Sequence, residues 1–86
     1  MKILIVEDDC ALREFMVSSV QEGGYEAQSA PDGAQGLKLF KKFQPDVVLS
    51  DINMPVMDGL EMLEKIRKID SNSLFIIIST LDSPKY

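Results

Sequence analysis

The sequence predicts an α/β fold in which helices cover both faces of a parallel sheet, a doubly wound arrangement. Three apolar runs, at residues 2–6, 47–50 and 74–79, have the length of strands and do not alternate between polar and apolar side chains. This pattern is typical of strands that are covered on both faces. Segments with helical spacing separate the runs, and the connections are short. Strands joined in this way form parallel sheets with right-handed crossovers.

The first half of the chain is expected to contain two strands and two helices. After the strand at 2–6, apolar residues recur at helical spacing from 11 to 22 and Gly23-Gly24 ends the helix. Residues 25–30 alternate as a short strand does, and a turn then leads to an amphipathic helix at 34–43. The side chains expected to face the core from the two helices are Leu12, Phe15, Met16, Val20, Leu37, Phe40 and Phe43.

The second half repeats the alternation with a strand, a helix and a further strand. Residues 47–50 form the third strand, and residues 60–69 have the spacing of a helix whose apolar side is expected to carry Leu60, Leu63, Ile66 and Ile69. A polar stretch at 70–73 ends that helix, and residues 74–79 are expected to form a fourth buried strand. The whole order is therefore β-α-β-α-β-α-β.

Composition excludes several classes of function. The chain has 86 residues, which is the size of one domain, and 45% hydrophobic with 27% charged residues is typical of a soluble globular protein. It has no histidine and one cysteine, which excludes a Ser-His-Asp triad, a histidine-ligated zinc site and an internal disulfide. The net charge of −5 argues against a nucleic-acid surface, and no apolar run approaches a membrane span. A cytoplasmic location is the expectation.

Acidic side chains follow two of the predicted strands directly. Glu7, Asp8 and Asp9 come after the first strand, Asp51 comes after the third, and the hydroxyls of Ser79 and Thr80 end the fourth. Because parallel strands present their carboxyl ends at one edge, these groups are expected to converge. Carboxylates in close contact repel one another unless a cation joins them, and ligands that are all oxygen suit Mg²⁺. Asp51 is therefore a metal ligand, a nucleophile, or both.

The stretch VVLSDINMPVMDG at 47–59, together with VEDD at 6–9 and the hydroxyl after the fourth strand, resembles the receiver domain of two-component response regulators. The resemblance covers the whole chain in order. It implies a flavodoxin-like fold with strand order 2-1-3-4. It also implies that Asp51 is the phosphoacceptor, which takes a phosphoryl group from a sensor histidine kinase, a phosphotransfer protein or a small phosphodonor, and that the domain is regulatory rather than an enzyme.

The resemblance further implies a role for each residue of the acidic edge. Asp8, Asp51 and the backbone carbonyl of Asn53 would bind Mg²⁺ directly, and Glu7 would act through water. Ser79 would donate a hydrogen bond to the phosphoryl group, with Thr80 as the alternate. Asp9 is less suited to be a ligand and is expected to cap the following helix. Taken without the motif, a strand-end aspartate or hydroxyl is more often a cap or a group satisfied by backbone.

Receiver domains have five βα units, whereas this sequence contains four strands and three helices. The expectation is an incomplete receiver at residues 1–86 that lacks the fourth helix, the fifth strand with its lysine, and the fifth helix. Its fourth strand would then be an apolar, uncharged edge, which favours a homo-oligomer through edge pairing or a domain swap. The alternative function is a fragment that folds or dimerises without phosphotransfer. A phosphatase of the haloacid dehalogenase type is disfavoured, since Asn53 stands where that family has a second acid.

Overall fold

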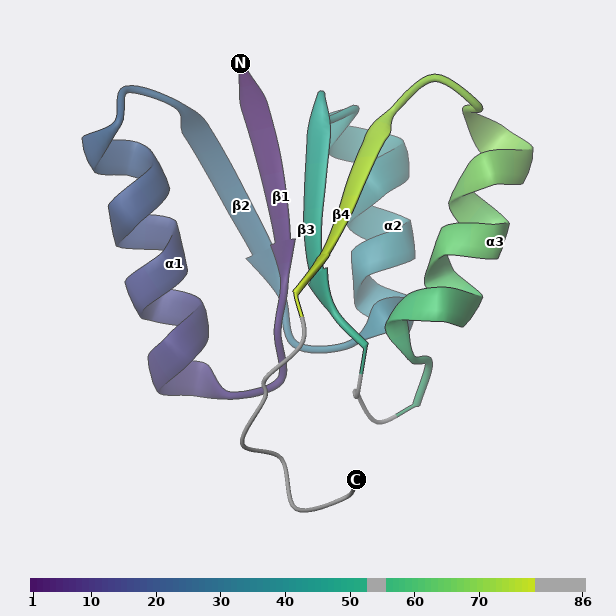
Figure 1. Cartoon of the computed structure of the whole chain (residues 1–86), viewed down its shortest axis with the longest axis horizontal. Helices are drawn as coiled ribbons and strands as arrows, with labels where there is room; N and C mark the ends of the chain where they lie inside the picture. The colour runs from purple at the N-terminus through teal and green to yellow at the C-terminus, as the bar shows by residue number, and fades with distance from the viewer. Residues whose placement is uncertain (53–55, 79–86) are drawn as a thin grey trace.

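The computed structural model describes residues 1–52 and 56–78, and the elements follow the expected order (Figure 1). In chain order they are β1 (Lys2–Val6), α1 (Cys10–Glu22), β2 (Glu26–Ala30), α2 (Gly33–Phe43), β3 (Val47–Asp51), α3 (Gly59–Ile69) and β4 (Leu74–Ile78). Most boundaries lie within one residue of those expected. In the described ranges, no helix is long and apolar enough to cross a membrane.

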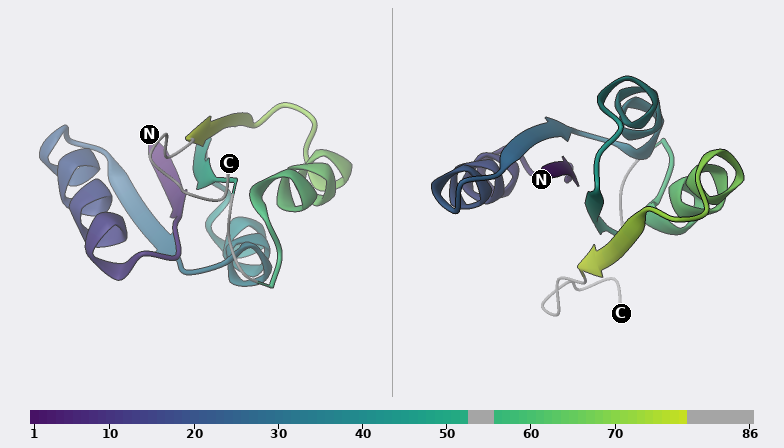
Figure 2. Two further views of the ribbon diagram at one scale, coloured as in Figure 1. Left: turned by 60° about the horizontal axis from the view of Figure 1, so that its bottom comes forward. Right: turned by 90° about the horizontal axis from the view of Figure 1, so that it is seen from above.

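The strands form one parallel sheet in the order β2-β1-β3-β4, which confirms the predicted fold class and strand order. Helix α1 lies on one face of the sheet, and α2 and α3 lie on the other (Figures 1 and 2). All four strands run in the same direction, so their carboxyl ends reach the same edge, at the bottom of Figure 1. The chain changes from one face of the sheet to the other after β2. In the order β2-β1-β3-β4 the two central strands are β1 and β3.

The larger part of the core lies between the sheet and α2 with α3. Its buried members are Leu4, Val6, Phe40, Phe43, Val48, Met62 and Ile66. The two helices approach closely because Gly36 of α2 has no side chain: a β-carbon there would lie 2.9 Å from the sulfur of Met62 and 2.9 Å from a methyl group of Val6. The predicted inward positions Phe40, Phe43 and Ile66 are confirmed.

Two residues expected to face the core from α3 do not do so. Leu60 is 52% exposed and Ile69 is 50% exposed, whereas Met62 is fully buried. The four apolar residues singled out from the sequence have helical spacing. The side of α3 that meets α2, however, is centred on Met62 and Ile66. Those two residues are one helical turn apart, at i and i+4.

The face of the sheet that carries α1 has a smaller core. Ile3, Ile5 and Val47 are buried there, and Met16, Val17 and Val20 of the helix pack against them. The expectation that Phe15 faces the core is wrong, since this side chain is 67% exposed. Helix α1 has no fully buried residue, because it covers only the β2–β1 side of the sheet.

Strand β4 is less buried than its apolar sequence indicates. Leu74, Ile76 and Ile78 are 55%, 42% and 38% exposed, which contradicts the expectation of a strand covered on both faces. Their register partners on β3 are Val47, Leu49 and Asp51, so they point to the face of the sheet that carries α1. In the described part of the chain, α1 does not extend over β4 and no strand pairs with its outer edge.

Candidate phosphoacceptor site

Three carboxylates meet where β1 and β3 end. Glu7 and Asp8 follow the last residue of β1, and Asp51 is the last residue of β3. Carboxylate oxygens of the three residues all lie within 4.8 Å of one another. The convergence expected from the sequence is therefore present for these three side chains.

Glu7 is buried, at 4% exposure, whereas Asp8 is exposed. The backbone N–H of Asp9 donates a hydrogen bond of 3.1 Å to Glu7 Oε2, and the guanidinium of Arg13 donates one of 2.9 Å to the Glu7 carbonyl oxygen. The Glu7 backbone N–H in turn donates to the carbonyl of Ala30 at the end of β2. These contacts fix the chain where it leaves the sheet, so that Asp8 projects beside Asp51.

Asp9 caps helix α1 and is not one of the three residues that form the acidic cluster. Its side chain accepts hydrogen bonds from the backbone N–H groups of Ala11 (3.0 Å) and Leu12 (3.2 Å). Asp9 also has the extended backbone of an N-cap residue. This confirms the expectation that Asp9 acts as a cap.

Asp51 lies at a buried strand end, with 6% of its surface exposed. The preceding Ser50 is 1% exposed, and its hydroxyl donates a hydrogen bond of 2.9 Å to the Asp51 carbonyl oxygen. Gly59 packs against the same carbonyl: a β-carbon there would lie 2.5 Å from the Asp51 oxygen and 3.1 Å from Ser50 Oγ. Helix α3 therefore begins in contact with the backbone of the phosphoacceptor candidate.

The start of α3 is tied to β3 and to α2. The Gly59 N–H donates to the Ile52 carbonyl (3.0 Å), and Asp58 caps the helix by accepting from the Glu61 N–H (2.8 Å). The Gly33 N–H donates to the carbonyl of Met57 (3.1 Å). Among the described glycines only Gly24 has a positive φ, so Gly59 serves close packing rather than a left-handed turn.

Glu7 is the member of the cluster whose charged form is disfavoured by its surroundings. Burial raises the pKa of Glu7 from 4.5 to about 7; the Asp9 N–H opposes this, whereas a hydrogen bond with Asp8 and the charges of Asp51 and Asp8 add to it. In the metal-free protein near neutral pH, a substantial fraction of Glu7 is therefore protonated. A cation would remove the proton and take its place.

The stability of the metal-free protein is expected to fall as the pH rises from about 4.5 to about 7. Within this window folded Glu7 holds a proton that the unfolded chain has released, so raising the pH favours unfolding. The contribution lost is roughly 3–4 kcal/mol. Urea unfolding in the presence of a chelator, across this range, measures it. Glu7→Gln should flatten the dependence, and an unchanged slope in that variant would contradict the assignment.

The donor set fits Mg²⁺. It consists of carboxylate oxygens, which this ion prefers, and Mg²⁺ binds oxygen at about 2.0–2.1 Å while retaining several waters. Two oxygens on opposite sides of one Mg²⁺ would then be about 4 Å apart. The carboxylate oxygens of the three residues lie within 4.8 Å of one another, which is close to this distance. Glu7, Asp8 and Asp51 can thus share one hydrated ion, directly or through its waters.

Of the predicted site residues, Asn53, Ser79 and Thr80 lie outside the described part of the chain. Two residues that contribute to the site, Ser50 and Arg13, were not predicted. Ser50 was expected only as part of a strand, and nothing in the sequence indicates its bond to Asp51. Arg13 was not assigned a role from the sequence. Its position one helical turn after the cap Asp9 is the signal that could have placed it near the acidic edge.

Comparison with known proteins identifies the family. Residues 3–86 match the model of the response regulator receiver domain. The chain is 35% identical over 82 residues to the response regulator MprA of Mycobacterium sp. (strain KMS), covering 95% of this chain and 36% of that protein. It is 35% identical over 81 residues to the chemotaxis protein CheY of Thermotoga maritima, covering 93% of this chain and 68% of CheY.

A solved structure is similar throughout the fold. The response regulator TrrA of Thermotoga maritima, crystallised in complex with Mg²⁺-BeF, superposes with a TM-score of 0.88 at 36% identity, over 94% of this chain and 70% of TrrA. The chain spans about a third of the length of MprA and about two thirds of the lengths of CheY and TrrA. The chain belongs to the receiver-domain family of two-component response regulators, a family of regulatory domains.

Proposed function

We propose that this chain is a phosphoacceptor that receives a phosphoryl group on Asp51 in the presence of Mg²⁺. The observation that carries the proposal is the meeting of the Glu7, Asp8 and Asp51 carboxylates within 4.8 Å at the carboxyl edge of the sheet. In the related TrrA, the crystallised complex contains Mg²⁺-BeF. The donor is a phosphohistidine on a sensor kinase or phosphotransfer protein, or a small acyl phosphate.

The transfer is an in-line displacement at phosphorus. A carboxylate oxygen of Asp51 forms the new O–P bond while the P–N bond of phosphohistidine, or the P–O bond of an acyl phosphate, breaks and the leaving group takes up the electron pair. Mg²⁺ supplies the neutralisation of charge on the transferring group. Asp51 is buried at the end of β3, a strand that pairs with both β1 and β4, and this holds the attacking group in one position.

The remaining site roles are part of the same proposal. Asp8 and Asp51 bind the ion directly and Glu7 through water, in keeping with the exposure of Asp8 and the burial of Glu7. The Asn53 carbonyl as a ligand, and Ser79 or alternatively Thr80 as a donor to the phosphoryl oxygens, stay predictions from the family resemblance.

Intact-protein mass spectrometry tests the proposal. After incubation with acetyl phosphate and Mg²⁺, the chain is expected to gain one phosphoryl group, and a chelator or the Asp51→Asn substitution should prevent the gain. If the wild type binds Mg²⁺ but gains nothing, the alternative applies, in which these residues fold or associate without phosphotransfer. A gain of equal size in Asp51→Asn would overturn the assignment of Asp51.

The open edge of β4 supports a second element of the proposal, that the 86-residue chain associates with a copy of itself. The strand has no charged residue, and Leu74, Ile76 and Ile78 form an exposed apolar row. An isologous antiparallel pairing centred on Ile76 would place Leu74 of one copy opposite Ile78 of the other, on the same face.

Ile76→Lys is expected to convert the associated form into a monomer, because a charge on an edge strand opposes pairing. Analytical ultracentrifugation over a range of concentrations measures the change. Ile69→Lys is the matched control, since Ile69 is 50% exposed on α3 and away from the edge. A wild-type chain that is a folded monomer at every concentration would contradict the association.

A further inference from the structure

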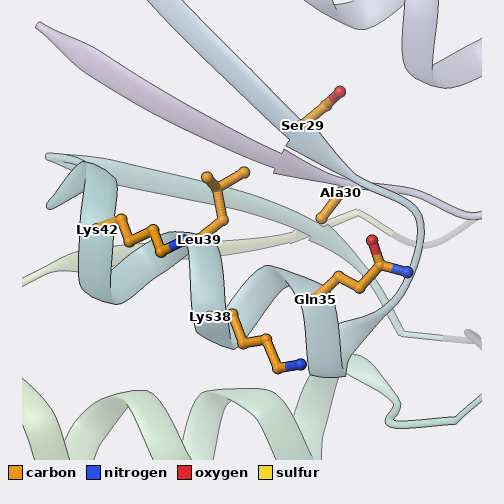
Figure 3. A pocket seen from close by; sticks show the side chains of 6 residues that line it. All are labelled: Ser29, Ala30, Gln35, Lys38, Leu39 and Lys42. Carbon is orange, nitrogen blue, oxygen red and sulfur yellow. The ribbon is translucent and has the colours of Figure 1, made fainter.

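The sheet has a second open edge, at β2, and a hollow runs beside it. Among the described strands β2 pairs only with β1. A hollow of about 420 Å³ lies between the end of β2 and α2, lined by Ser29, Ala30, Gln35, Lys38, Leu39 and Lys42 (Figure 3). It lies outside the acidic cluster and shares no residue with it.

The backbone of β2 presents hydrogen-bonding groups toward this edge. The Glu26 N–H donates to the carbonyl of Met1, and the Ala30 carbonyl accepts from the Glu7 N–H, so both residues direct their backbone groups toward β1. Directions alternate along a strand, and Ala27 and Ser29 therefore direct their N–H and C=O groups outward. Ser29 is one of the residues that line the hollow.

The wall formed by α2 is basic. Gln35, Lys38, Leu39 and Lys42 are spaced at i, i+3, i+4 and i+7, which places them along one side of the helix. In the described part of the chain, neither lysine has an ion-pair or hydrogen-bond partner, and the Gln35 amide is bonded to Asp32 near the helix start. In a chain with a net charge of −5, the wall is a local concentration of unpaired positive charge.

We propose that an acidic, extended segment of a partner protein adds to the sheet as a strand at the outer edge of β2, with its carboxylates on Lys38 and Lys42. Strand addition uses the outward backbone groups of Ala27 and Ser29 for affinity, and side-chain contacts for specificity. The aliphatic stems of the lysines with Leu39 and Ala30 offer apolar surface between the charges.

The spacing of the two lysines matches an extended chain. Residues four apart on a helix rise by about 6 Å along its axis. Alternate residues of a strand point to the same face and lie about 6.6 Å apart. A segment with acidic residues at alternate positions can therefore meet both lysines at once, and uncharged residues between them would point to the face that carries α1.

Binding of a capped peptide that alternates Glu with Val tests the proposal, with a peptide that alternates Gln with Val as the control. Fluorescence anisotropy is expected to show binding of the Glu peptide that weakens with salt, and amide chemical shifts are expected to change at Ala27 and Ser29. The Lys38→Glu/Lys42→Glu variant should weaken binding at least about tenfold, because like charges would then face each other.

The matched control for charge is Lys65→Glu/Lys68→Glu on α3, which changes the net charge by the same amount. Each double variant replaces one lysine in the last turn of its helix, Lys42 in α2 and Lys68 in α3. The control variant should bind as the wild type does. Ser29→Pro removes an outward N–H without removing a bond to β1, so it should weaken binding while the fold is retained.

The proposal would be overturned by no binding of the Glu peptide to the wild type, by equal binding of the Gln peptide, or by chemical-shift changes confined to residues away from β2. Weakening by the Lys65/Lys68 double variant equal to that of the Lys38/Lys42 variant would also overturn it, because it would indicate attraction by net charge alone.

Discussion

Replacing Gly59 with alanine is expected to lower the free energy of unfolding by about 1–3 kcal/mol and to slow phosphorylation of Asp51. The added β-carbon would lie 2.5 Å from the Asp51 carbonyl oxygen, and that atom belongs to the backbone of a central strand, so it cannot move aside cheaply. Any shift that relieves the contact moves Asp51. A displacement of about 1 Å at a reacting group can reduce a rate by about a hundredfold.

Urea unfolding and the initial rate of acetyl phosphate-dependent labelling measure the two effects. Gly23→Ala is the matched control, since Gly23 ends α1 with an ordinary helical φ of −76°. The atoms nearest to an added β-carbon there belong to the Tyr25 ring, at 3.2 Å, and the Val20 carbonyl, at 3.3 Å. Because the ring can move, the cost there should be small. A Gly59→Ala chain as stable and as active as Gly23→Ala would contradict the packing described at the start of α3.

The second large effect is expected from Asp8→Asn, which should weaken Mg²⁺ binding at least about tenfold. Asp8 is the exposed member of the cluster, so its carboxylate is the one that reaches both the solvent-borne ion and Asp51. Asparagine keeps the size and one oxygen but removes the charge. Isothermal titration calorimetry gives the dissociation constant, and phosphorylation should require correspondingly more Mg²⁺.

Asp9→Asn provides a close control for this substitution. The two aspartates are adjacent and the charge change is the same, but Asp9 caps α1 through Ala11 and Leu12. Asparagine is as good a cap as aspartate, so both stability and Mg²⁺ affinity should change little. If Asp9→Asn weakened Mg²⁺ binding as much as Asp8→Asn does, the assignment of ligands along this stretch would be wrong.

The parallel sheet and the acidic cluster were predictable from the residues for a common reason, whereas the strand order 2-1-3-4 was implied by the resemblance to receiver domains. The central strands are apolar on both faces and end abruptly in acids, and a parallel sheet brings such ends together. The role of Asp9 could be distinguished from that of Asp8 because Asp9 is closer to the predicted start of the helix, where an N-cap residue stands. The burial of Glu7 and its raised pKa were not predicted, although its position directly after a buried strand is the signal that could have indicated them.

Other features depend on packing that the sequence does not specify. Periodicity shows that α1 is amphipathic but not which residues lie at the centre of its contact, so Phe15 was placed inward although Val17 packs on the sheet. Met62 is buried because Gly36 of α2 admits its sulfur, which is a contact between distant segments. The apolar sequence of β4 indicates burial on both faces, whereas its position at an edge of the described sheet was expected only from the family resemblance.

Among the described strands, β2 and β4 each have an unpaired outer edge, and the residues at these edges suit the two different partners proposed above. β4 is uncharged, and its exposed side chains are apolar, which favours pairing with a like strand. β2 lies beside the wall that carries Lys38 and Lys42, whose positive charges favour an acidic segment. Variants that affect one edge should therefore leave binding at the other unchanged.

Mapping the phosphorylated residue tests the central claim most directly. The chain is treated with acetyl phosphate and Mg²⁺, the acyl phosphate is reduced with borohydride, and peptides are sequenced by mass spectrometry. We expect the reduced residue at position 51 and at no other acidic position. Labelling at Glu7, Asp8 or Asp9 in place of Asp51, or labelling that does not depend on Mg²⁺, would contradict the proposal that Asp51 is the phosphoacceptor of this site.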